Sequence, residues 1–346
     1  MKKIYILRAN KTIFGGAENY LSRFANSMNK KNYEFEIINS PISKKFPSWF
    51  RAVLFNIIVC FKKKEKFYFS LERISCPDVY RAGDGVHRAF LRLTEKSKFN
   101  LLHPIYLYLE KKCFNNAKKI IANSKMIKNQ IVEEYGVEPK NIEVVYNGID
   151  TNKRVRSYKY SAKEISKEFN VDLKKPIFLY VGNGFKRKGV QEFVNILKKI
   201  HKRDFLAFII GADKDMDFYQ NMVSQSNLNG KIIFTGQRKD VDKFFSVSDF
   251  FILPTYYDPF SNVILEAMFF KNIVFTTQNN GASEILNKKF IMRKPTDFSV
   301  IQTINSLLDD ERAITKIKEY NHSLSLKYSI SANLTKTIRI INEVIN

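Results

Sequence analysis

The chain has 346 residues, of which 45% are hydrophobic, enough for two domains with full cores. This excludes a disordered tail, a collagen-like fibre and a disulfide-stapled miniprotein. The formal net charge is +24, and residues 1–128 hold 26 Lys and Arg against 9 Asp and Glu. Such an excess indicates either an anionic partner, nucleic acid or acidic lipid, or only a Lys-rich composition.

The cysteine content and the apolar runs indicate in which compartment the protein works and whether it crosses a membrane. The three cysteines are Cys60, Cys76 and Cys113, with no CxxC pair. This pattern fits neither a disulfide framework nor a zinc site, and it favours a reducing cytoplasm. The longest apolar run, 49–61, is interrupted by Arg51 and Asn56 and is shorter than the ~20 residues of a membrane-spanning helix. The apolar start of the chain is too short for a secretory signal. No membrane crossing is therefore expected.

Short β-branched or aromatic runs alternate with helical patterns, which is typical of parallel sheets wrapped by helices. The expected strands of the first half are 3–9, 33–39, 78–83, 118–124 and 143–147. Those of the second half are 176–182, 205–211, 231–236, 249–255 and 272–277. Between the first two strands, Leu21, Phe24, Ala25 and Met28 share one helical face. The polar stretch 147–164 separates two doubly wound halves, and a helical segment, 311–346, completes the chain.

A glycine pair, Gly15 and Gly16, follows the first strand, and a helix is expected from Ala17. Adjacent glycines at such a place let an anion reach backbone N–H groups, although a tight turn without a ligand has the same pattern. A dinucleotide site would add GxGxxG and an acidic residue after the second strand, where this chain has Asn39 and Ser40. A nicotinamide cofactor is therefore disfavoured.

The segment VGNGFKRKGV, 181–190, runs from a strand into a glycine-bearing turn. It would place Arg187 and Lys188 at the carboxyl end of the strand, where open α/β sheets bind ligands. A fixed pair of cations there suits a diphosphate, since Arg offers a fork of donors and Lys a point charge. A solvated basic turn is the alternative.

The segment TYYDPFSNVILEA, 255–267, leads from a strand into an apolar helix. We expect Glu266 in the first turn of that helix, close to Asp258, with the amides around Asn262 and Val263 facing the same ligand. Carboxylates accept hydrogen bonds from sugar or ribose hydroxyls, and amides bind phosphate. The alternative is that Glu266 is only a first-turn acid favoured by the helix dipole.

The spacing from Asp258 through Pro-Phe to Glu266 resembles the E-P-F-G-x-x-x-x-E signature of the family 4 retaining glycosyltransferases, which have the GT-B fold. VGNGFKRKGV is similar to their phosphate-binding turn, NNGASE (279–284) to their late GG-x-x-E motif and VVYNGID (144–150) to their domain junction. The glycine pair is similar to their first glycine loop. Within the family, VGNGFKRKGV and DVYRAGDGVH (78–87) are most similar to lipopolysaccharide core glucosyltransferases of Gram-negative bacteria. Asp258 stands in place of Glu and Ser261 in place of Gly, and both departures bear on the transferred sugar.

The resemblance implies an α/β protein with the GT-B fold, in which two Rossmann-like, doubly wound parallel-sheet domains face a cleft. Residues 1–155 would form the acceptor-binding domain, on which a C-terminal helix at about 330–346 can pack back. Residues 156–329 would bind the nucleotide sugar. The implied activity is transfer of a hexose, with retention of configuration, to a lipopolysaccharide or lipooligosaccharide core. The first expectation for the hexose is glucose, and for the donor a UDP-sugar. Another lipid-linked or capsular glycan is the alternative acceptor, and a basic membrane- or nucleic-acid-binding protein is the alternative that is not an enzyme.

The resemblance also implies residue roles. The catalytic candidates are Asp84, Arg187, Lys188 and Asp258, with His87 as a second candidate on the acceptor side. The donor-binding candidates are Gly15, Gly16, Gly182, Arg187, Lys188, Arg238, Asp258, Phe260, Ser261, Asn262, Val263 and Glu266. No metal or other cofactor is expected, because fixed cations and the helix dipole would neutralise the departing diphosphate. The Asp213–Asp215 pair is interpreted as a loop and helix cap.

Two stretches, 46–66 and 88–119, combine large apolar residues with Lys and Arg. We expect such segments to lie on an anionic membrane surface, the second being the better candidate because it follows Asp84. Ordinary core residues beside solvated lysines are the alternative. The expected partners are thus a nucleotide-sugar donor, a lipid-linked acceptor and an anionic membrane, without nucleic acid. The expected location is the inner face of the cytoplasmic membrane, as a peripheral protein.

Overall fold

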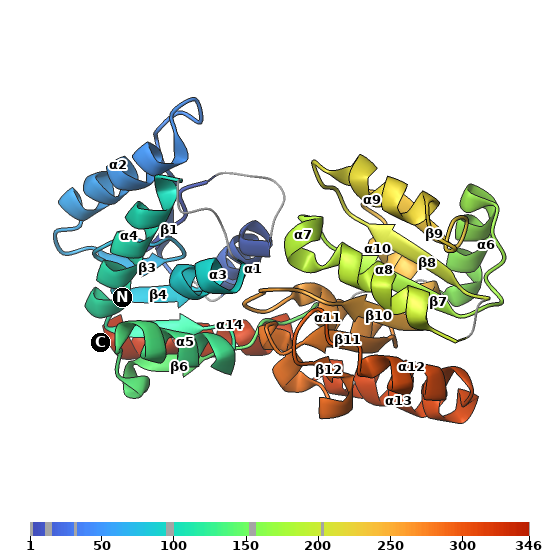
Figure 1. Ribbon diagram of the computed structural model, residues 1–346. Coiled ribbons are helices and arrows are strands. Elements are labelled where there is room, and N and C mark those ends of the chain that lie inside the picture. The colour runs from blue at the N-terminus through green and yellow to red at the C-terminus, as the bar shows by residue number, and fades with distance from the viewer. Residues whose placement is uncertain are drawn as a thin grey trace. The chain divides into compact units, whose positions relative to one another are not determined.

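The computed structural model describes residues 3–10, 16–30, 33–94, 100–151, 157–201 and 204–345, of which 16–19 and 30 by their backbone alone. The chain forms two compact units: unit 1 comprises Met1–Asn147 and Ile330–Asn346, and unit 2 comprises Gly148–Ser329. The chain changes units at Gly148, whereas the boundary expected at 155/156 falls on residues outside the described ranges. Each unit consists of a parallel sheet with helices on its two faces (Figure 1).

Unit 1 contains a six-stranded sheet in the order β2-β1-β3-β4-β5-β6, with parallel neighbours throughout. Its strands are β1 (Ile4–Leu7), β2 (Phe35–Ile38), β3 (Phe67–Ser70), β4 (Val79–Ala82), β5 (Lys119–Ala122) and β6 (Ile142–Val144). Its helices are α1 (Gly16–Lys30), α2 (Ser48–Phe61), α3 (His87–Thr94), α4 (Leu102–Asn116), α5 (Lys125–Tyr135), the 3-10 turn Pro139–Asn141 and α14 (Ile330–Ile345). The five strands expected in this half are present. β3 was not expected, although all four of its residues are buried.

The two faces of this sheet are covered by different helices. On one face, Phe24 and Met28 of α1 pack with Leu334 and Ile338 of α14 against β1 and β3. On the other face, Phe55 of α2 packs in a second apolar cluster with residues of β1 and β3. The C-terminal helix therefore belongs to the core of unit 1.

Cys60 and Cys76 form a disulfide that joins α2 to the segment before β4, and Cys113 is a buried free thiol. The expectation that the cysteines do not pair was wrong, so the cysteines no longer favour a reducing cytoplasm. The two residues are 16 positions apart in the sequence, and their Cα atoms lie 5.8 Å apart because α2 returns the chain to the neighbourhood of β3. This contact depends on the tertiary fold and leaves no trace in CxxC spacing.

Unit 2 contains the second six-stranded sheet, in the order β12-β11-β10-β7-β8-β9, also parallel. Its strands are β7 (Ile177–Val181), β8 (Leu206–Ile210), β9 (Ile232–Gly236), β10 (Phe250–Leu253), β11 (Ile273–Thr277) and β12 (Ile291–Met292). Its helices are α6 (Tyr158–Phe169), α7 (Phe185–Lys188), α8 (Val190–Lys199), α9 (Met216–Ser224), α10 (Val241–Val247), α11 (Asn262–Phe269), α12 (Val300–Leu308) and α13 (Glu311–Ser325), with 3-10 turns at Gly281–Ile285 and Lys288–Phe290. The five strands expected here are present, and the two-residue β12 is additional.

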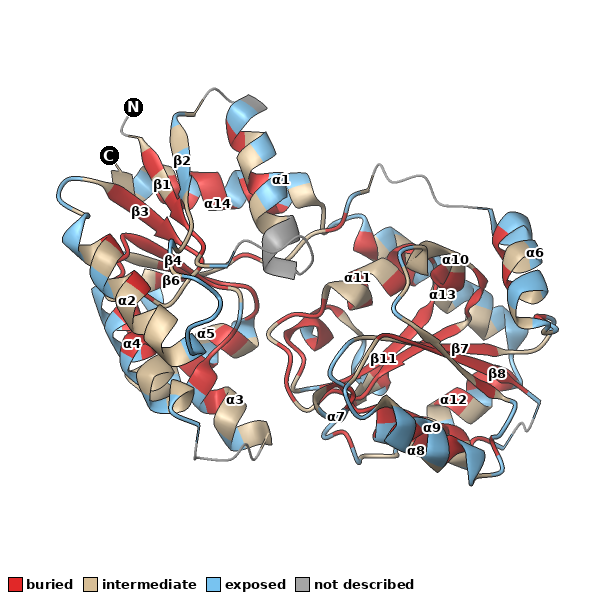
Figure 2. Cartoon of the chain, turned by 90° about the horizontal axis from the view of Figure 1, so that it is seen from above, coloured by how far each residue is buried: buried red, intermediate tan, exposed pale blue. Residues whose placement is uncertain are grey.

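The strands of unit 2 are near-continuous apolar runs because helices cover both faces of the sheet. β8, β10 and β11 are buried at every position, and the red strands of Figure 2 show this buried layer. The ends of unit 2 meet each other: Ile149 forms a parallel bridge with Ser329, and its N–H donates to the carbonyl of Tyr328 at 2.9 Å. The chain therefore enters and leaves unit 2 at one place.

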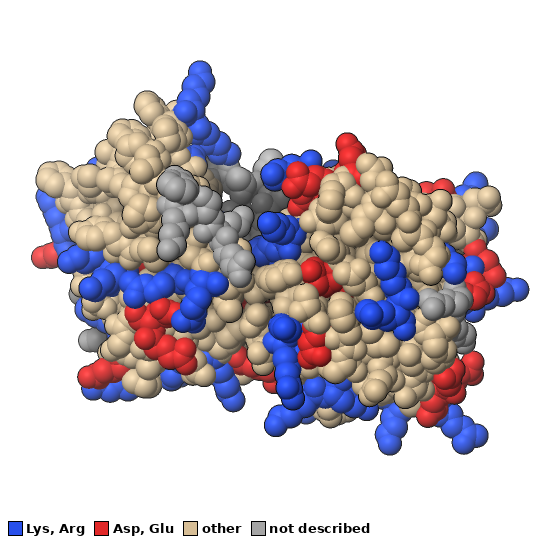
Figure 3. All heavy atoms as spheres, in the orientation of Figure 1, with Lys and Arg blue, Asp and Glu red and all other residues tan. Residues whose placement is uncertain are grey.

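The charged surface is mixed. On the face drawn in Figure 3, Lys and Arg side chains are distributed over both units, with Asp and Glu side chains among them. None of the helices in the described part of the chain has the length and apolar character of a membrane-spanning segment.

Candidate functional site

The candidate site of unit 2 lies where its strand order reverses. β7 is hydrogen-bonded to β8 on one side and to β10 on the other, so the connections that follow β7 and β10 diverge to opposite sides. Open α/β sheets bind ligands in the crevice at the carboxyl ends of two such strands. The segments after β7 and after β10 contain the two motifs that the sequence singled out.

Glycines shape the turn after β7. Gly184 and Gly189 flank α7 with φ values of 74° and 80°, in the left-handed region that other residues rarely adopt. At Gly189 a Cβ atom would lie 2.0 Å from the carbonyl oxygen of Pro254, so no side chain fits. This close approach brings α7 against the segment that follows β10. Gly182 precedes the turn, and a Cβ atom at this position would lie 3.6 Å from the stem of Lys188, an ordinary van der Waals contact.

Lys188 is buried, with 9% of its surface exposed. Its ammonium group donates hydrogen bonds to the carboxylate of Asp258 and, at 2.9 Å, to the hydroxyl of Ser261. Burial lowers the pKa of Lys188, and the neighbouring Asp258 acts in the opposite direction. Two of the three N–H donors of the ammonium group thus have partners inside the protein.

Asp258 is the acceptor at the centre of this cluster. Burial by itself would raise its pKa, but the positive charges of Lys188 and Arg187 hold it below the ordinary value. The hydroxyl of Ser261 donates to the same carboxylate at 2.6 Å, and the N–H of Phe260 donates to it at 3.2 Å. Asp258 is therefore an ionised carboxylate fixed by several donors.

Arg187 is the more accessible cation, with 35% of its side chain exposed. One guanidinium nitrogen donates to the carbonyl of Tyr257 at 2.9 Å and lies 3.8 Å from the Asp258 carboxylate. The cation pair expected from the sequence is thus present. Its members differ, since Lys188 is enclosed and Arg187 faces outward.

Helix α11 begins directly after this cluster, at Asn262. Glu266 is its fifth residue, one turn further than expected, and the first turn contains no acidic residue. The alternative interpretation of Glu266, an acid in the first turn favoured by the helix dipole, is therefore wrong. Phe260 and Ser261 are buried, whereas Asn262, Val263 and Glu266 are half-buried at the start of the helix.

Asn280, in the NNGASE segment, is a buried residue whose role in the site was not predicted. Its side-chain oxygen accepts hydrogen bonds from the N–H groups of Ser261 and Ala282, both at 3.1 Å. Asp258 and Asn280 also form an isolated parallel bridge. Asn280 therefore fixes the loop before α11 to the segment after β11. The motif was recognised, but the sequence pattern does not say which of its residues faces the loop.

Arg238, a donor-binding candidate, and the Asp213–Asp215 pair, interpreted as a loop and helix cap, have other partners within unit 2. Arg238 makes four hydrogen bonds to the carboxylates of Glu168 and Asp240, which raises its pKa. Asp213 accepts from the N–H of Phe185 at 2.6 Å and from that of Asp215 at 2.9 Å, and Asp215 makes no side-chain cap on α9. Within the described residues, no group of three His, Cys, Asp or Glu side chains is placed to hold a metal ion.

The candidates of unit 1 lie after β4. Asp84 is exposed in the turn, 3.7 Å from the guanidinium of Arg8. His87 is buried at the start of α3, with its Nε2 3.1 Å from Nδ1 of His103, and burial followed by the charge of Arg73 lowers its pKa to about 4. Glu110, buried on α4, accepts the backbone N–H of His87 at 2.7 Å. His87 is therefore held as a neutral side chain by neighbours that the sequence did not reveal.

The glycine pair is only partly visible. Gly15 lies outside the described residues, and Gly16 is the first residue of α1, one position earlier than expected.

Comparison with known families identifies two matching segments. Residues 161–323 match the family described as "Glycosyl transferases group 1", and residues 80–153 match "Glycosyltransferase Family 4". One relative is the N-acetylgalactosamine-N,N'-diacetylbacillosaminyl-diphospho-undecaprenol 4-alpha-N-acetylgalactosaminyltransferase of Campylobacter jejuni. It is 24% identical over 221 residues, 63% of this chain and 57% of the relative. The chain spans about half the length of the curated relatives that it matches first, 44% and 57% for two of them.

Solved structures match over the whole chain. WaaG, a glycosyltransferase involved in lipopolysaccharide biosynthesis, superposes with a TM-score of 0.81 at 18% identity, covering 98% of this chain and 99% of WaaG. Anabaena HepE in complex with UDP and glucose superposes with a TM-score of 0.76 at 16% identity, covering 99% of this chain and 100% of HepE. At these identities the likeness establishes the fold, which is GT-B.

Proposed function

We propose that the chain is a glycosyltransferase of the group 1, family 4 kind and that it transfers a hexose from UDP-hexose, with retention of configuration, to a lipid-linked saccharide. The two family matches and the GT-B fold support this. The observation that carries the proposal is the buried Lys188–Asp258–Ser261 cluster, with Arg187 beside it, at the strand-order reversal of unit 2.

In this proposal the positive charge of the Arg187–Lys188 pair stabilises the departing nucleoside diphosphate. As the bond between the sugar and the diphosphate breaks, negative charge grows on the diphosphate oxygens, and preorganised cations stabilise it most in the transition state. In this proposal Arg187 donates hydrogen bonds to the diphosphate from its exposed guanidinium. Lys188 donates from the third N–H of its ammonium group. The N-terminus of α11 adds the positive end of its dipole.

The carboxylates serve the sugars of the donor. In this proposal Asp258 positions the hexose hydroxyls and Glu266, half-buried on α11, accepts from the ribose. Gly182, Phe260, Ser261, Asn262 and Val263 form the backbone around them. Gly15 and Gly16 stay donor-binding candidates on the sequence alone. Arg238, with its donors committed to Glu168 and Asp240, contributes to the base-binding end through its backbone and not through a free guanidinium.

Unit 1 supplies the acceptor side. Asp84 is the exposed carboxylate of the turn after β4, and it is the candidate for contact with the acceptor hydroxyl. His87 is buried against His103 and is held neutral, which fits a positioning role for this turn. A lipopolysaccharide core is the first acceptor that we propose. An undecaprenyl-linked saccharide, as named for the Campylobacter relative, is the alternative.

The acceptor is membrane-bound in either case, and unit 1 has an apolar surface suited to a membrane. Ile57 and Phe61 lie four residues apart on α2, with 56% and 86% of their surfaces exposed, and Phe46 precedes the helix with 51% exposed. Leu101, just before α4, and Tyr108 on α4 are also exposed, and α4 packs against α2. Lysines at 62–64 follow α2 directly. We therefore place the anionic membrane on α2 and α4, and the enzyme at the cytoplasmic face.

Purified full-length protein tests the proposal. Thermal shifts with a panel of UDP-, GDP- and ADP-hexoses should identify a UDP-hexose as the ligand that raises the melting temperature most. That donor should then be hydrolysed slowly, and faster transfer should follow when a lipid-linked saccharide is added. Glu266→Ala should weaken the shift produced by UDP-hexose, whereas Glu311→Ala, which removes an exposed carboxylate at the start of α13, should not. Failure of every nucleotide sugar to bind would contradict the proposal.

A further inference from the structure

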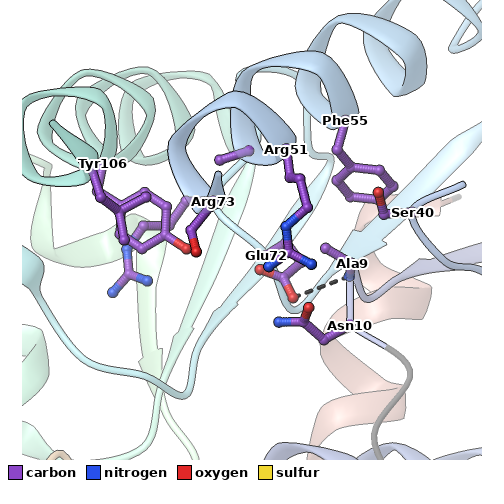
Figure 4. A pocket seen from close by; sticks show the side chains of 11 residues that line it. Ala9, Asn10, Ser40, Arg51, Phe55, Glu72, Arg73 and Tyr106 are labelled. Carbon is purple, nitrogen blue, oxygen red and sulfur yellow. Dashed lines mark hydrogen bonds between the residues drawn. The ribbon is translucent and has the colours of Figure 1, made fainter. Parts of the chain in front are cut away.

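Unit 1 has a cavity at the strand-order reversal of its own sheet. β1 lies between β2 and β3, so the connection after β1 leads to one side and the connection after β3 leads to the other, as after β7 and β10 in unit 2. The cavity measures about 160 Å³ and is bounded by the segments after β1, β2 and β3 and by α2 and α4. Figure 4 shows Asn10, Glu72 and Tyr106 around it, with Arg51 extending from α2 toward the end of β1.

Most charges near this cavity are paired within unit 1. Glu72 accepts from the guanidinium of Arg8 at 2.9 Å and from the N–H of Ala9 at 3.1 Å. Arg73 donates to the buried carboxylate of Glu110 at 2.9 Å and to the carbonyl of Gly85 at 2.9 Å. These two arginine–glutamate pairs therefore leave little net charge to offer a ligand.

Arg51 is different. Its Nε is buried and has no hydrogen-bond partner, and no carboxylate of the described residues forms an ion pair with its guanidinium. A buried donor without a partner costs free energy, more so when the group is charged. Holding such a group at the wall of a cavity is consistent with a ligand that supplies the missing acceptor.

From this arrangement we infer that the cavity binds an acidic sugar residue of the acceptor, whose phosphate or carboxylate pairs with Arg51. Guanidinium groups bind both anions through paired, charge-assisted hydrogen bonds. The hydroxyls of Ser40, Ser48 and Tyr106 and the amide of Asn10 line the same cavity and suit sugar hydroxyls. Phe55 supplies an apolar wall for the C–H face of a ring.

The size of the cavity agrees with a single sugar. Pockets that hold a complete drug-sized ligand measure about 300–1,000 Å³. A cavity of about 160 Å³ is too small for a nucleotide sugar. The inference rests on the proposed function only in assigning the acidic sugar to the acceptor of the transfer.

The test measures the binding of glucose, glucose 6-phosphate, glucuronate and inorganic phosphate to the full chain by calorimetry. Saturating UDP occupies the Arg187–Lys188 site throughout, so that phosphate groups do not report on unit 2. We expect both acidic sugars to bind about tenfold or more tightly than glucose. We also expect inorganic phosphate to bind more weakly than glucose 6-phosphate, because it leaves the hydroxyl-lined wall unused.

Three variants locate the effect. Arg51→Gln removes the unpaired guanidinium and should abolish the preference for acidic sugars. Ser48→Asp adds a carboxylate one turn before Arg51, at the first position of α2, where the helix dipole tolerates it, and should have the same effect without unfolding the protein. Arg23→Gln, which removes an exposed charge from α1, is the matched control and should keep the preference.

The outcomes separate the two proposals. Equal binding of glucose and the acidic sugars, or a preference that survives both Arg51→Gln and Ser48→Asp, overturns the inference. Inorganic phosphate binding as tightly as glucose 6-phosphate overturns its sugar part. Absence of UDP binding contradicts the proposed function instead. The Arg51 and Ser48 variants then still test whether the cavity binds acidic sugars.

Discussion

Lys188 and Asp258, 70 residues apart in the sequence, form a buried ion pair where the connections after β7 and β10 meet. Both groups are almost fully enclosed, and each determines the charge of the other: the Lys188 charge holds the pKa of Asp258 down against its burial. A pair of this kind combines a structural function with the chemical one that we propose.

Truncating Lys188 should therefore affect both stability and activity. Lys188→Ala leaves Asp258 buried without its partner, and the free energy of unfolding should fall by about 3–5 kcal/mol. Transfer should fall by about 10²-fold or more, because a cation at the developing charge is lost. Denaturant unfolding and initial rates measure the two effects.

A double variant separates the two contributions. Lys188→Met with Asp258→Asn removes both charges and should regain much of the stability without regaining turnover. Arg187→Gln, at a half-exposed position, should lose rate with little loss of stability. Near-normal turnover in Lys188→Ala would rule out the assigned role of this residue.

The two departures from the family signature should be coupled. The Ser261 hydroxyl lies between Asp258 and Lys188, 2.6 Å and 2.9 Å from their polar atoms, so it occupies the place that a longer Glu at 258 would need. Asp258→Glu alone should lower stability and transfer because the site is overfilled. Asp258→Glu with Ser261→Gly should recover both. Additive effects in this double-variant cycle would show that the two positions are independent.

Transfer should persist in EDTA. Arg187, Lys188 and the start of α11 already place positive charge where the diphosphate would depart. Rates measured before and after chelation should therefore agree. Complete loss of activity in EDTA with recovery on Mn²⁺ addition would direct attention to Asp213 and Asp215.

Membrane binding should depend on α2. Ile57→Ser with Phe61→Ser removes two exposed apolar side chains and should weaken binding to vesicles containing anionic lipid by about tenfold or more. Binding by the wild type should decrease as salt rises. The comparison variant is Arg88→Gln with Arg92→Gln, two residues that bond to Glu134 of α5. If this second variant loses vesicle binding and the first does not, the contact lies on the 88–119 segment.

The stability of unit 1 should fall in mild acid through His87. Its pKa of about 4 lies below the value of about 6.5 for an unfolded His, so the unfolded state takes up the proton first. The stabilising contribution is complete above about pH 6.5 and is lost progressively between pH 6.5 and pH 4. Trp49, the single tryptophan of the chain, lies in unit 1 and reports its unfolding.

His87→Gln should flatten this pH dependence. His201→Gln, at an exposed position of unit 2, should leave the slope unchanged. An identical slope for wild type and His87→Gln would show that another group is responsible.

The alternation of strands and helices could be predicted because buried parallel strands are short apolar runs between amphipathic helices. β3 was not predicted because Phe67–Ser70 follows the apolar α2 after a few lysines and no helix separates it from β4. The Cys60–Cys76 disulfide was not predicted for a related reason. Both depend on how α2 folds back beside β1.

The site was predictable as far as its motifs reach. The sequence indicated Arg187, Lys188 and Asp258 as residue types suited to a diphosphate and a sugar. It could not show that Lys188 and Asp258 pair in the interior, that Asn280 secures the loop of Ser261, or that Arg238 is engaged by two carboxylates. Such contacts join residues that only the sheet order brings together.

The bridge between Ile149 and Ser329 makes unit 2 an insertion within unit 1. Since its two ends are adjacent, residues 148–329 can be excised and a short linker can rejoin Asn147 to Ile330, giving each sheet its own independently expressed domain. The reverse also follows. Deletion of α14 would remove Leu334, Ile338 and Ile341 from the core of the first sheet and leave the second intact. A helix that follows unit 2 in the sequence therefore completes the core of the unit that precedes it.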